Sequence, residues 1–304
     1  MLLINLLVLI ISVLLGVAFL TLFERKVLGY VHNRKGPNKL FVKGFTQPFS
    51  DALKLLSKEV LIFYMKDYIY FFSSMFMFLF SMMLWLVYPW LMNNFSYSIL
   101  VMILFLSFNV YPVIFIAWSS NNNYSMLSSL RVVAQMISFE IMLFILIFVF
   151  ILLIESFSLN LLFKFQDLVF AVVLLPIYLI VFISMLIELN RTPFDLIEGE
   201  SELVSGFNIE FSGGLFTLIF LAEYSSIMFM GVFLTILFYG VMPQSFIFVL
   251  IYMIHVYLII LVRGVLPRIR YDQMMYMCWT DFLIISLTYM FYIWVIKEGL
   301  LLMS

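Results

Sequence analysis

The chain has one cysteine, two histidines and few charged residues, and each shortage excludes a class of protein. Cys278 alone cannot form a disulfide framework, a thiolate zinc site, or an iron–sulfur cluster held by this chain alone. His32 and His255 are too few for a haem pair or a histidine metal cluster unless partner chains contribute ligands. Only 11% of the 304 residues are charged, whereas about a quarter are charged in soluble domains. An ordinary soluble domain is therefore excluded.

Hydrophobic residues make up 65% of the chain, and its mean hydropathy is +1.17. A single soluble core cannot bury so many apolar residues, whereas a helix that spans a bilayer needs about 20 of them. The sequence therefore predicts an all-α integral membrane protein, with one polytopic domain over 1–304 and about eight transmembrane helices. We expect the spans at 2–23, 68–90, 96–118, 132–154, 168–189, 215–240, 245–263 and 281–297.

Basic residues lie almost entirely in alternate loops. Of the 16 Lys and Arg residues, only Lys164 and Lys297 lie outside the loops and loop edges after the first, third, fifth and seventh spans. By the positive-inside rule, the other fourteen mark the matrix or cytoplasmic side. We therefore expect both termini on the opposite side, which in a mitochondrion is the intermembrane-space side.

The composition also indicates the source of the gene. The chain has 36 Phe and 21 Met residues but only six alanines, which is the bias expected from codons rich in A and T. This bias favours an organellar gene and a protein of the mitochondrial inner membrane. A bacterial endosymbiont gene would show the same bias.

The first long loop contains an amphipathic stretch at 44–59. Phe45, Phe49, Leu53 and Leu56 recur at helical spacing, and polar residues take the opposite face. The pattern predicts a helix that lies in the plane of the membrane interface. The simpler interpretation is a lipid-surface anchor, and the more specific one is a doorway for a hydrophobic ligand.

Two carboxyl groups are expected deep in the membrane, Glu140 in the fourth span and Glu223 in the sixth. Each lies nine positions past its basic-side boundary, 131 or 214, which is roughly 13 Å in a layer about 30 Å thick. An ionisable group at this depth marks a proton or ion path by default. The alternative is a carboxyl that only bonds neighbouring helices together. The matched depth favours a proton relay, whereas we expect His255 to be a satisfied core histidine.

The loop at 188–210 is acidic but also carries apolar residues. Six acids accompany the single base Arg191, while the loops on the same membrane side are basic. Opposite charges on one side predict that these loops pack against one another. We therefore expect a structured acidic loop rather than a solvated one.

Several common functional motifs are absent. The sequence has no G-x-G-x-x-G, no P-loop, no C-x-x-C and no nucleophile elbow. The basic stretch at 25–43 lies next to a membrane span, so its expected partners are anionic lipids or proteins and not nucleic acid.

The order of six polar segments resembles a known family. They are ERKVLGYVHNRKGPN (24–38), QPFSDALKLLSKE (47–59), NNNYSMLSSLRVVAQMISFE (121–140), ELNRTPFDLIEGESELVSGFNIE (188–210), AEYSSI (222–227) and RGVLPRIRYDQMMYMCW (263–279). Together they resemble the subunit 1 family of NADH:ubiquinone oxidoreductase, the quinone-channel membrane subunit of respiratory complex I. The resemblance covers essentially the whole chain. The chain departs from it at His32 (usually Gln), Val60 (usually Pro) and Thr280 (usually Lys).

The resemblance implies a role in quinone reduction and proton translocation without a redox centre in this chain. Ubiquinone would be the substrate, and NADH, FMN and the Fe–S clusters would be bound by partner subunits of the peripheral and membrane arms. The implied proton path consists of Glu140, Glu188, Glu198, Glu200, Glu202 and Glu223. The implied quinone-channel and loop-packing residues are Arg25, Arg34, Asp51, Lys54, Arg191, Asp195 and Arg268.

Two other functions fit the buried acids. A proton- or sodium-coupled secondary transporter is disfavoured because no internal repeat is evident and the acidic loop is expected to fold. The related membrane subunit of a membrane-bound hydrogenase is disfavoured by the full set of channel loops and the organellar composition. Migration with a very large assembly in native electrophoresis would favour the complex I subunit.

The expected topology predicts the accessibility of two serines in polar loops. Cysteines introduced at Ser57 and Ser205 should react with an impermeant thiol reagent only after the matrix face is opened, because both loops are on the basic side. Labelling of both from the intermembrane-space side would contradict the topology.

Overall fold

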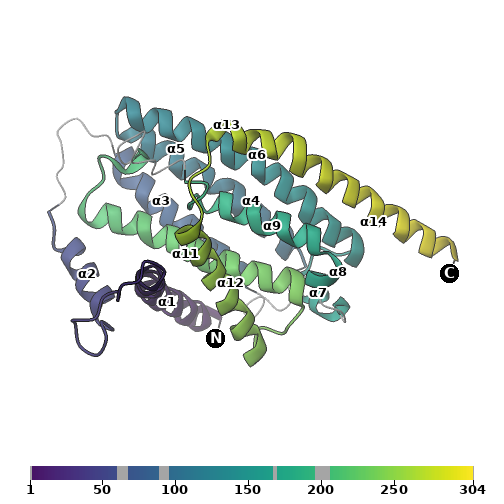
Figure 1. Cartoon of the computed structure of the whole chain (residues 1–304), viewed down its shortest axis with the longest axis horizontal. Coiled ribbons are helices and arrows are strands. Elements are labelled where there is room, and N and C mark those ends of the chain that lie inside the picture. Colours follow the sequence, from purple (N-terminus) through teal and green to yellow (C-terminus); the bar gives the residue numbers. More distant parts are fainter. Residues whose placement is uncertain (1, 60–67, 89–95, 167–169, 196–205, 304) are drawn as a thin grey trace.

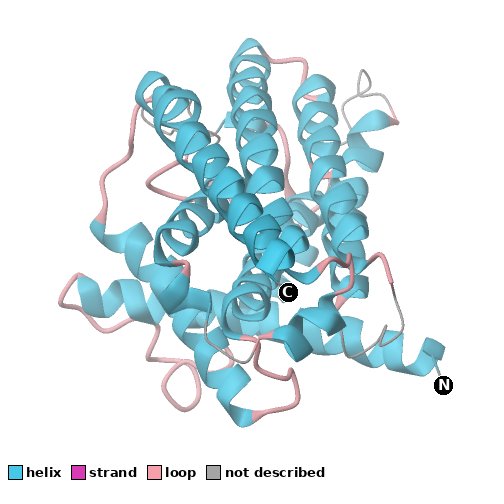
Figure 2. Ribbon diagram, turned by 90° about the vertical axis from the view of Figure 1, so that its right-hand side faces the viewer, coloured by secondary structure: helices cyan, strands magenta, loops and turns pink. Residues whose placement is uncertain are grey.

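The computed structural model describes residues 2–59, 68–88, 96–166, 170–195 and 206–303, which form helices joined by loops (Figure 1). Figure 2 shows no strand among the described residues, and the all-α membrane class is confirmed. The elements are α1 (Leu2–Val31), α2 (Gln47–Leu56), α3 (Ile69–Leu84), η1 (Trp85–Val87), α4 (Ser98–Phe108), α5 (Val110–Ser119), α6 (Asn123–Ile154), α7 (Leu159–Phe165), α8 (Phe170–Val173), α9 (Leu175–Glu188), η2 (Gly206–Asn208), α11 (Gly213–Tyr239), α12 (Phe246–Val265), α13 (Tyr271–Tyr276), the π-helical η3 (Met277–Phe282) and α14 (Leu283–Met303).

Seven helical segments of the described chain are long and apolar enough to cross a membrane. They match seven of the eight expected spans and are Ile4–Val31, Tyr68–Val87, Ser98–Ser119, Asn123–Ile154, Gly213–Tyr239, Phe246–Val265 and Tyr271–Gly299. In Figure 1, α2 and the starts of α6 and α11 lie at one end of the bundle, which we call the basic end. The C-terminus, α7 and α8 lie at the opposite end.

The expected fifth span, 168–189, is wrong as a single helix. In its place α8 and the 14-residue α9 are separated at Leu174, and residues 167–169 lie outside the described part. Pro176 is in the first turn of α9, where it needs no helical N–H partner but prevents α8 from continuing through. Hydropathy alone cannot detect this break because every residue around it is apolar.

Three helices extend further into the basic end than the expected spans. Helix α1 runs to Val31 instead of 23, α6 begins at Asn123 instead of 132, and the last helix begins at Tyr271 instead of 281. Parts of the segments expected as loops are therefore helical. Hydropathy marks only the part of a helix that fits the apolar layer, whereas a helix continues until its capping or turn residues. The side chain of Asn122 accepts from the Tyr124 N–H and caps α6 in this way.

Helix α2 is the amphipathic helix expected at 44–59, although it is shorter, from Gln47 to Leu56. It lies beside α1 at the basic end (Figure 1), where the ring of Phe19 packs 4.8 Å from Phe45 and 6.0 Å from Phe49, between ring centres. Leu53 and Leu56 remain 69% and 64% exposed. The helix therefore presents an apolar surface that this chain does not cover.

The third span is kinked between α4 and α5 at Asn109. Pro112 has no N–H to give to the carbonyl of Phe108, four residues earlier, so the helical hydrogen bonding is interrupted here. The kink places a polar residue, Asn109, inside an otherwise apolar span.

The half of the bundle away from the basic end is nearly free of charge. His255 is the only Asp, Glu, Lys, Arg or His in the segments 2–23, 69–87, 98–119, 141–154, 175–187, 224–239, 246–262 and 283–296. Charges return only at the far end, with Lys164 of α7, Glu155 after α6, and Lys297 and Glu298 of α14. The ring of His255 is buried, with Nδ1 2.8 Å from the Ile251 carbonyl and Nε2 3.1 Å from the Tyr178 hydroxyl. The expectation of a satisfied core histidine is confirmed.

Candidate functional site

A cluster of charged side chains lies where four segments meet at the basic end. Arg191, just after α9, has Nη1 3.6 Å from Glu24 Oε1 of α1 and Nη2 3.7 Å from Glu223 Oε2 of α11. Its guanidinium carbon lies 4.7 Å from the ring centre of Tyr224. The Tyr224 hydroxyl donates to Glu24 Oε2 at 2.6 Å, and Arg263 of α12 pairs with Glu24 Oε1. We call these five residues the ion cluster.

The ion cluster is electrically balanced, with two carboxylates and two guanidinium groups. Glu24, Arg191 and Tyr224 are each less than a tenth exposed. Removing charges from water is costly unless they are paired, so the cluster is stable only when all its members are present. It therefore fixes α1, α11, α12 and the end of α9 relative to one another.

A second pair of acids lies beside the ion cluster. Glu188 is the last residue of α9 and is buried, and its carboxyl interacts electrostatically with that of Glu140 in α6. The hydroxyl of Ser107 in α4 contacts the Glu140 carboxyl. The buried side chain of Gln135 donates to the Ile187 carbonyl at 3.0 Å, which holds the end of α9 against α6.

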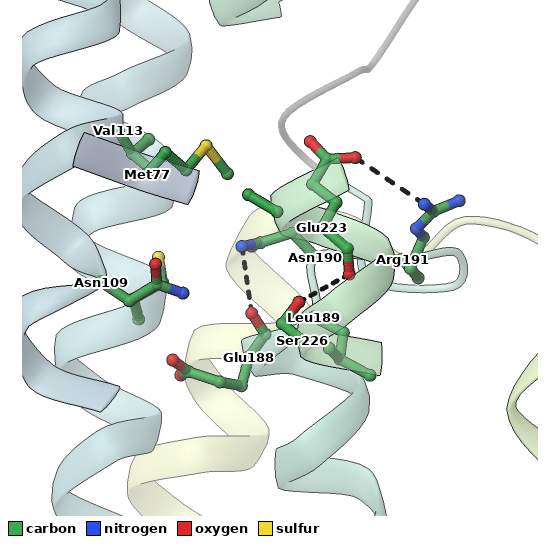
Figure 3. A pocket seen from close by; sticks show the side chains of 11 residues that line it. Met77, Asn109, Val113, Glu188, Leu189, Asn190, Arg191, Glu223 and Ser226 are labelled. Carbon is green, nitrogen blue, oxygen red and sulfur yellow. Dashed lines mark hydrogen bonds and ion pairs between the residues drawn. The ribbon is translucent and has the colours of Figure 1, made fainter. Parts of the chain in front are cut away.

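A cavity lies between Glu188 of this acid pair and Arg191 and Glu223 of the ion cluster (Figure 3). It is small, with room for roughly two water molecules. Glu188, Asn190, Arg191, Glu223, Ser226 and Asn109 supply its polar walls. Glu140 and Glu223, expected at matched depth, are thus in separate groups, and Glu188 lies between them.

The loops at the basic end pack against one another as expected from their opposite charges. Arg268 Nη2 lies 3.4 Å from Asp195 Oδ2, and the Ile269 N–H donates to the Pro193 carbonyl at 3.0 Å. Asp195 is buried although it belongs to the acidic loop. The loop is therefore structured up to Asp195, and Glu198, Glu200 and Glu202 lie outside the described residues.

The predicted channel residues of the first loop fall into two groups. Arg25 pairs with Asp51, which also accepts from Gln47 Nε2 at 2.9 Å, so α1 holds α2. Arg34 and Lys54 are exposed and form no ion pair with another described residue. Among the described contacts, only Arg25 and Asp51 have a structural role, which is to hold α2 against α1.

Sequence reasoning did not assign Glu24, Tyr224 and Arg263 to the site. Glu24 and Arg263 begin two of the polar segments that carry the family resemblance, and Tyr224 lies within a third, AEYSSI. The available signal was that each lies on a helix at the same basic end, where a buried charge needs a partner. Their pairing joins residues up to 239 positions apart, which no local pattern reveals.

Comparison with known proteins identifies the family. A family model described as NADH dehydrogenase matches residues 4–294. The chain belongs to the NADH dehydrogenase family. NADH-ubiquinone oxidoreductase chain 1 of Apis mellifera ligustica is 56% identical over 301 residues, which cover 98% of both chains. The proteins of the same name from Locusta migratoria and Hipposideros armiger terasensis are each 48% identical, over 96% and 94% of this chain and 94% of theirs.

Family membership confirms the resemblance seen in the six polar segments. Within the described residues, no group of three or more His, Cys, Asp or Glu side chains is placed to bind a metal ion. The polar chemistry of the site therefore consists of carboxyl, guanidinium, amide and hydroxyl groups.

The ion cluster predicts that loss of one cation is more damaging than loss of an ion pair. Arg191→Met should destabilise the assembled protein by about 3 kcal/mol or more, because Glu223 and Glu24 lose a buried partner. The double variant Arg191→Met/Glu223→Gln should recover part of this loss. Thermal denaturation of the purified assembly measures both effects. A double variant no more stable than the single one would contradict charge balance as the cause.

Proposed function

We propose that this chain is a core membrane subunit of proton-translocating NADH:ubiquinone oxidoreductase, respiratory complex I. The observation that carries the proposal is the 56% identity, over 98% of the chain, to a protein named NADH-ubiquinone oxidoreductase chain 1. The cavity that Glu188 and Glu223 share at the basic end supports it. Other subunits of the peripheral and membrane arms are its partners, and they bind NADH, FMN and the Fe–S clusters. The chain lies in the mitochondrial inner membrane with both termini on the intermembrane-space side.

The quinone part of the proposal assigns α1, α2 and the packed loops to the ubiquinone-access channel. The exposed Leu53 and Leu56 give α2 an apolar surface at the membrane interface, which suits entry of a hydrophobic quinone from the lipid. The Arg25–Asp51 pair holds α2 against α1. The Arg268–Asp195 pair ties the last basic loop to the acidic one. Arg34 and Lys54 add positive charge along the same loop.

The proton part of the proposal begins at the acid pair and continues through the cavity to the ion cluster. Glu140 and Glu188 are two like-charged groups close together, and such a pair favours a state that holds one proton between them. The cavity lies between Glu188 and Glu223 and has room for water. Glu198, Glu200 and Glu202 would deliver protons from the acidic loop.

An alternative role is supported for Glu223 alone. Its ion pair with Arg191 is the contact that a purely structural carboxyl would make. Glu188 and Glu140 interact instead with each other. If Glu223 is only structural, neutral variants of Glu140 and Glu188 should impair proton transfer, whereas a neutral variant of Glu223 should not.

Neutral variants of the membrane acids test the relay. Glu140→Gln and Glu223→Gln keep size and hydrogen bonding but remove the titratable proton. Proton pumping and ubiquinone reduction should fall together by at least about tenfold in each, because the two steps are coupled. Both rates are measured in the assembled complex. Glu155→Gln is the control, since Glu155 pairs with Lys297 at the opposite end. If pumping and turnover were unchanged in both variants, the relay would be wrong and both carboxyls would have only a structural role.

Loosening α2 tests the quinone channel. Asp51→Asn removes the partly exposed ion pair with Arg25, so the apparent KM for ubiquinone should rise about two- to fivefold while kcat is kept. Lys58→Gln, which removes a charge just beyond α2, is the control. A photoreactive quinone-site inhibitor should crosslink within residues 24–59. A fall in pumping without any change of KM would contradict the assignment of α2 to the channel.

A further inference from the structure

The buried carboxyl of Glu188 lacks hydrogen-bond donors among the described residues. Glu188 is 8% exposed, and its electrostatic neighbour is another acid, Glu140. Asn190 Nδ2 donates at 3.3 Å to the backbone carbonyl of Glu188, but no described residue donates to its carboxyl. A buried carboxyl without hydrogen-bond donors is costly. Glu188 borders the cavity, where water would supply such donors.

Asn109 lies on the other side of the same cavity and is also unsatisfied. It occupies the kink between α4 and α5, and its buried Oδ1 atom has no hydrogen-bond partner within the described part of the chain. Figure 3 shows its amide nitrogen turned toward the space that Glu188 and Asn190 border. The Oδ1 atom of Asn190 is likewise buried without a partner. Two amides and a carboxyl therefore surround one small space.

The size of this space decides what fills it. It has room for roughly two water molecules and is too small for a quinone head group. Buried waters typically make about three hydrogen bonds to polar groups that are otherwise unsatisfied. The walls offer the groups that such waters need, whereas an apolar cavity of this size would stay dry.

We propose that Asn109 holds ordered water against the Glu188 carboxyl and is thereby a positioning residue for proton transfer. This inference rests on the proposed function. The Asn109 N–H donates to the water, and the water donates to a Glu188 carboxyl oxygen. A second water reaches from there to Asn190 Oδ1 and toward Glu223.

The amide suits this role because it does not titrate. When a proton passes, the water gives one proton to the acceptor carboxylate and receives another from the donor carboxyl, so the water is unchanged. Asn109 orients the water throughout and neither gains nor loses a proton. The kink at Pro112 is what allows a polar side chain of the third span to reach this position.

Three substitutions separate the amide from the shape of the side chain. Asn109→Leu keeps the size but cannot bind water, so kcat for ubiquinone reduction and proton pumping should both fall about tenfold with unchanged KM. Asn109→Ser keeps a hydroxyl and leaves more room for water, so it should restore both rates to within about twofold. Asn5→Leu is the same substitution at an exposed position of α1 and should change neither rate.

The Glu188→Gln variant separates the two proposals. If Asn109→Leu keeps both rates while Glu188→Gln loses them, the role of Asn109 is wrong and the relay stands. If Glu188→Gln also keeps both rates, the proton part of the proposed function fails.

If the Asn109→Leu variant does not assemble, a second measurement on the unaltered complex tests the proposal instead. In a map of the unaltered complex that resolves other buried waters, density should appear about 2.7–3.2 Å from both Asn109 Nδ2 and the Glu188 carboxyl. Absence of that density would overturn the proposal.

Discussion

The guanidinium group of Arg191 lies between the carboxylates of Glu24 and Glu223 and against the ring of Tyr224. Each of these carboxylates would be costly to bury alone, and Arg191 with Arg263 makes their burial possible. Because the partners come from α1, α11, α12 and the segment after α9, the charge balance also sets where these segments stand. The cavity and the acid pair are located by the same arrangement, since Arg191 borders the cavity and Glu188 is three residues before it.

The acids at the basic end therefore divide into two electrostatic types. Glu24 and Glu223 each lie beside a guanidinium group. Glu140 and Glu188 interact electrostatically with each other and form no ion pair with a described cation. One acid of each type, Glu223 and Glu188, borders the same small polar cavity. This is the arrangement in which movement of a proton changes the field at a neighbouring ion pair.

Much of the fold could be predicted from the sequence because apolar length and charge distribution are local signals. Seven spans and the amphipathic helix α2 follow from them directly. The extra turns of α1 and α6 could not be predicted, since a helix does not end where its apolar residues end. The break before α9 was missed because Pro176 lies among residues that are all apolar.

The site could be predicted only in part. Depth and residue type identified Glu140 and Glu223 as unusual, and the family resemblance added Glu188, Arg191 and Asp195. The sequence could not predict which side chains interact. These are the ion pairs of Glu223 with Arg191 and of Glu24 with Arg263, and the electrostatic interaction of Glu140 with Glu188. These contacts depend on how the helices pack, and Glu24 and Arg263 are 239 positions apart. Asn109 was missed because a single polar residue in an apolar span has no periodic pattern.

The nearly charge-free half of the bundle has an electrical consequence. Between the basic end and the charges at the far end (Glu155, Lys164, Lys297 and Glu298), its helical segments hold no Asp, Glu, Lys or Arg, and the one histidine has both ring nitrogens engaged. This half is therefore an insulating layer, across which each 100 mV of membrane potential opposes or drives one charge by about 2.3 kcal/mol. Under the proposed function, a proton that enters at the acids meets no further carboxyl group in this layer of the described helices.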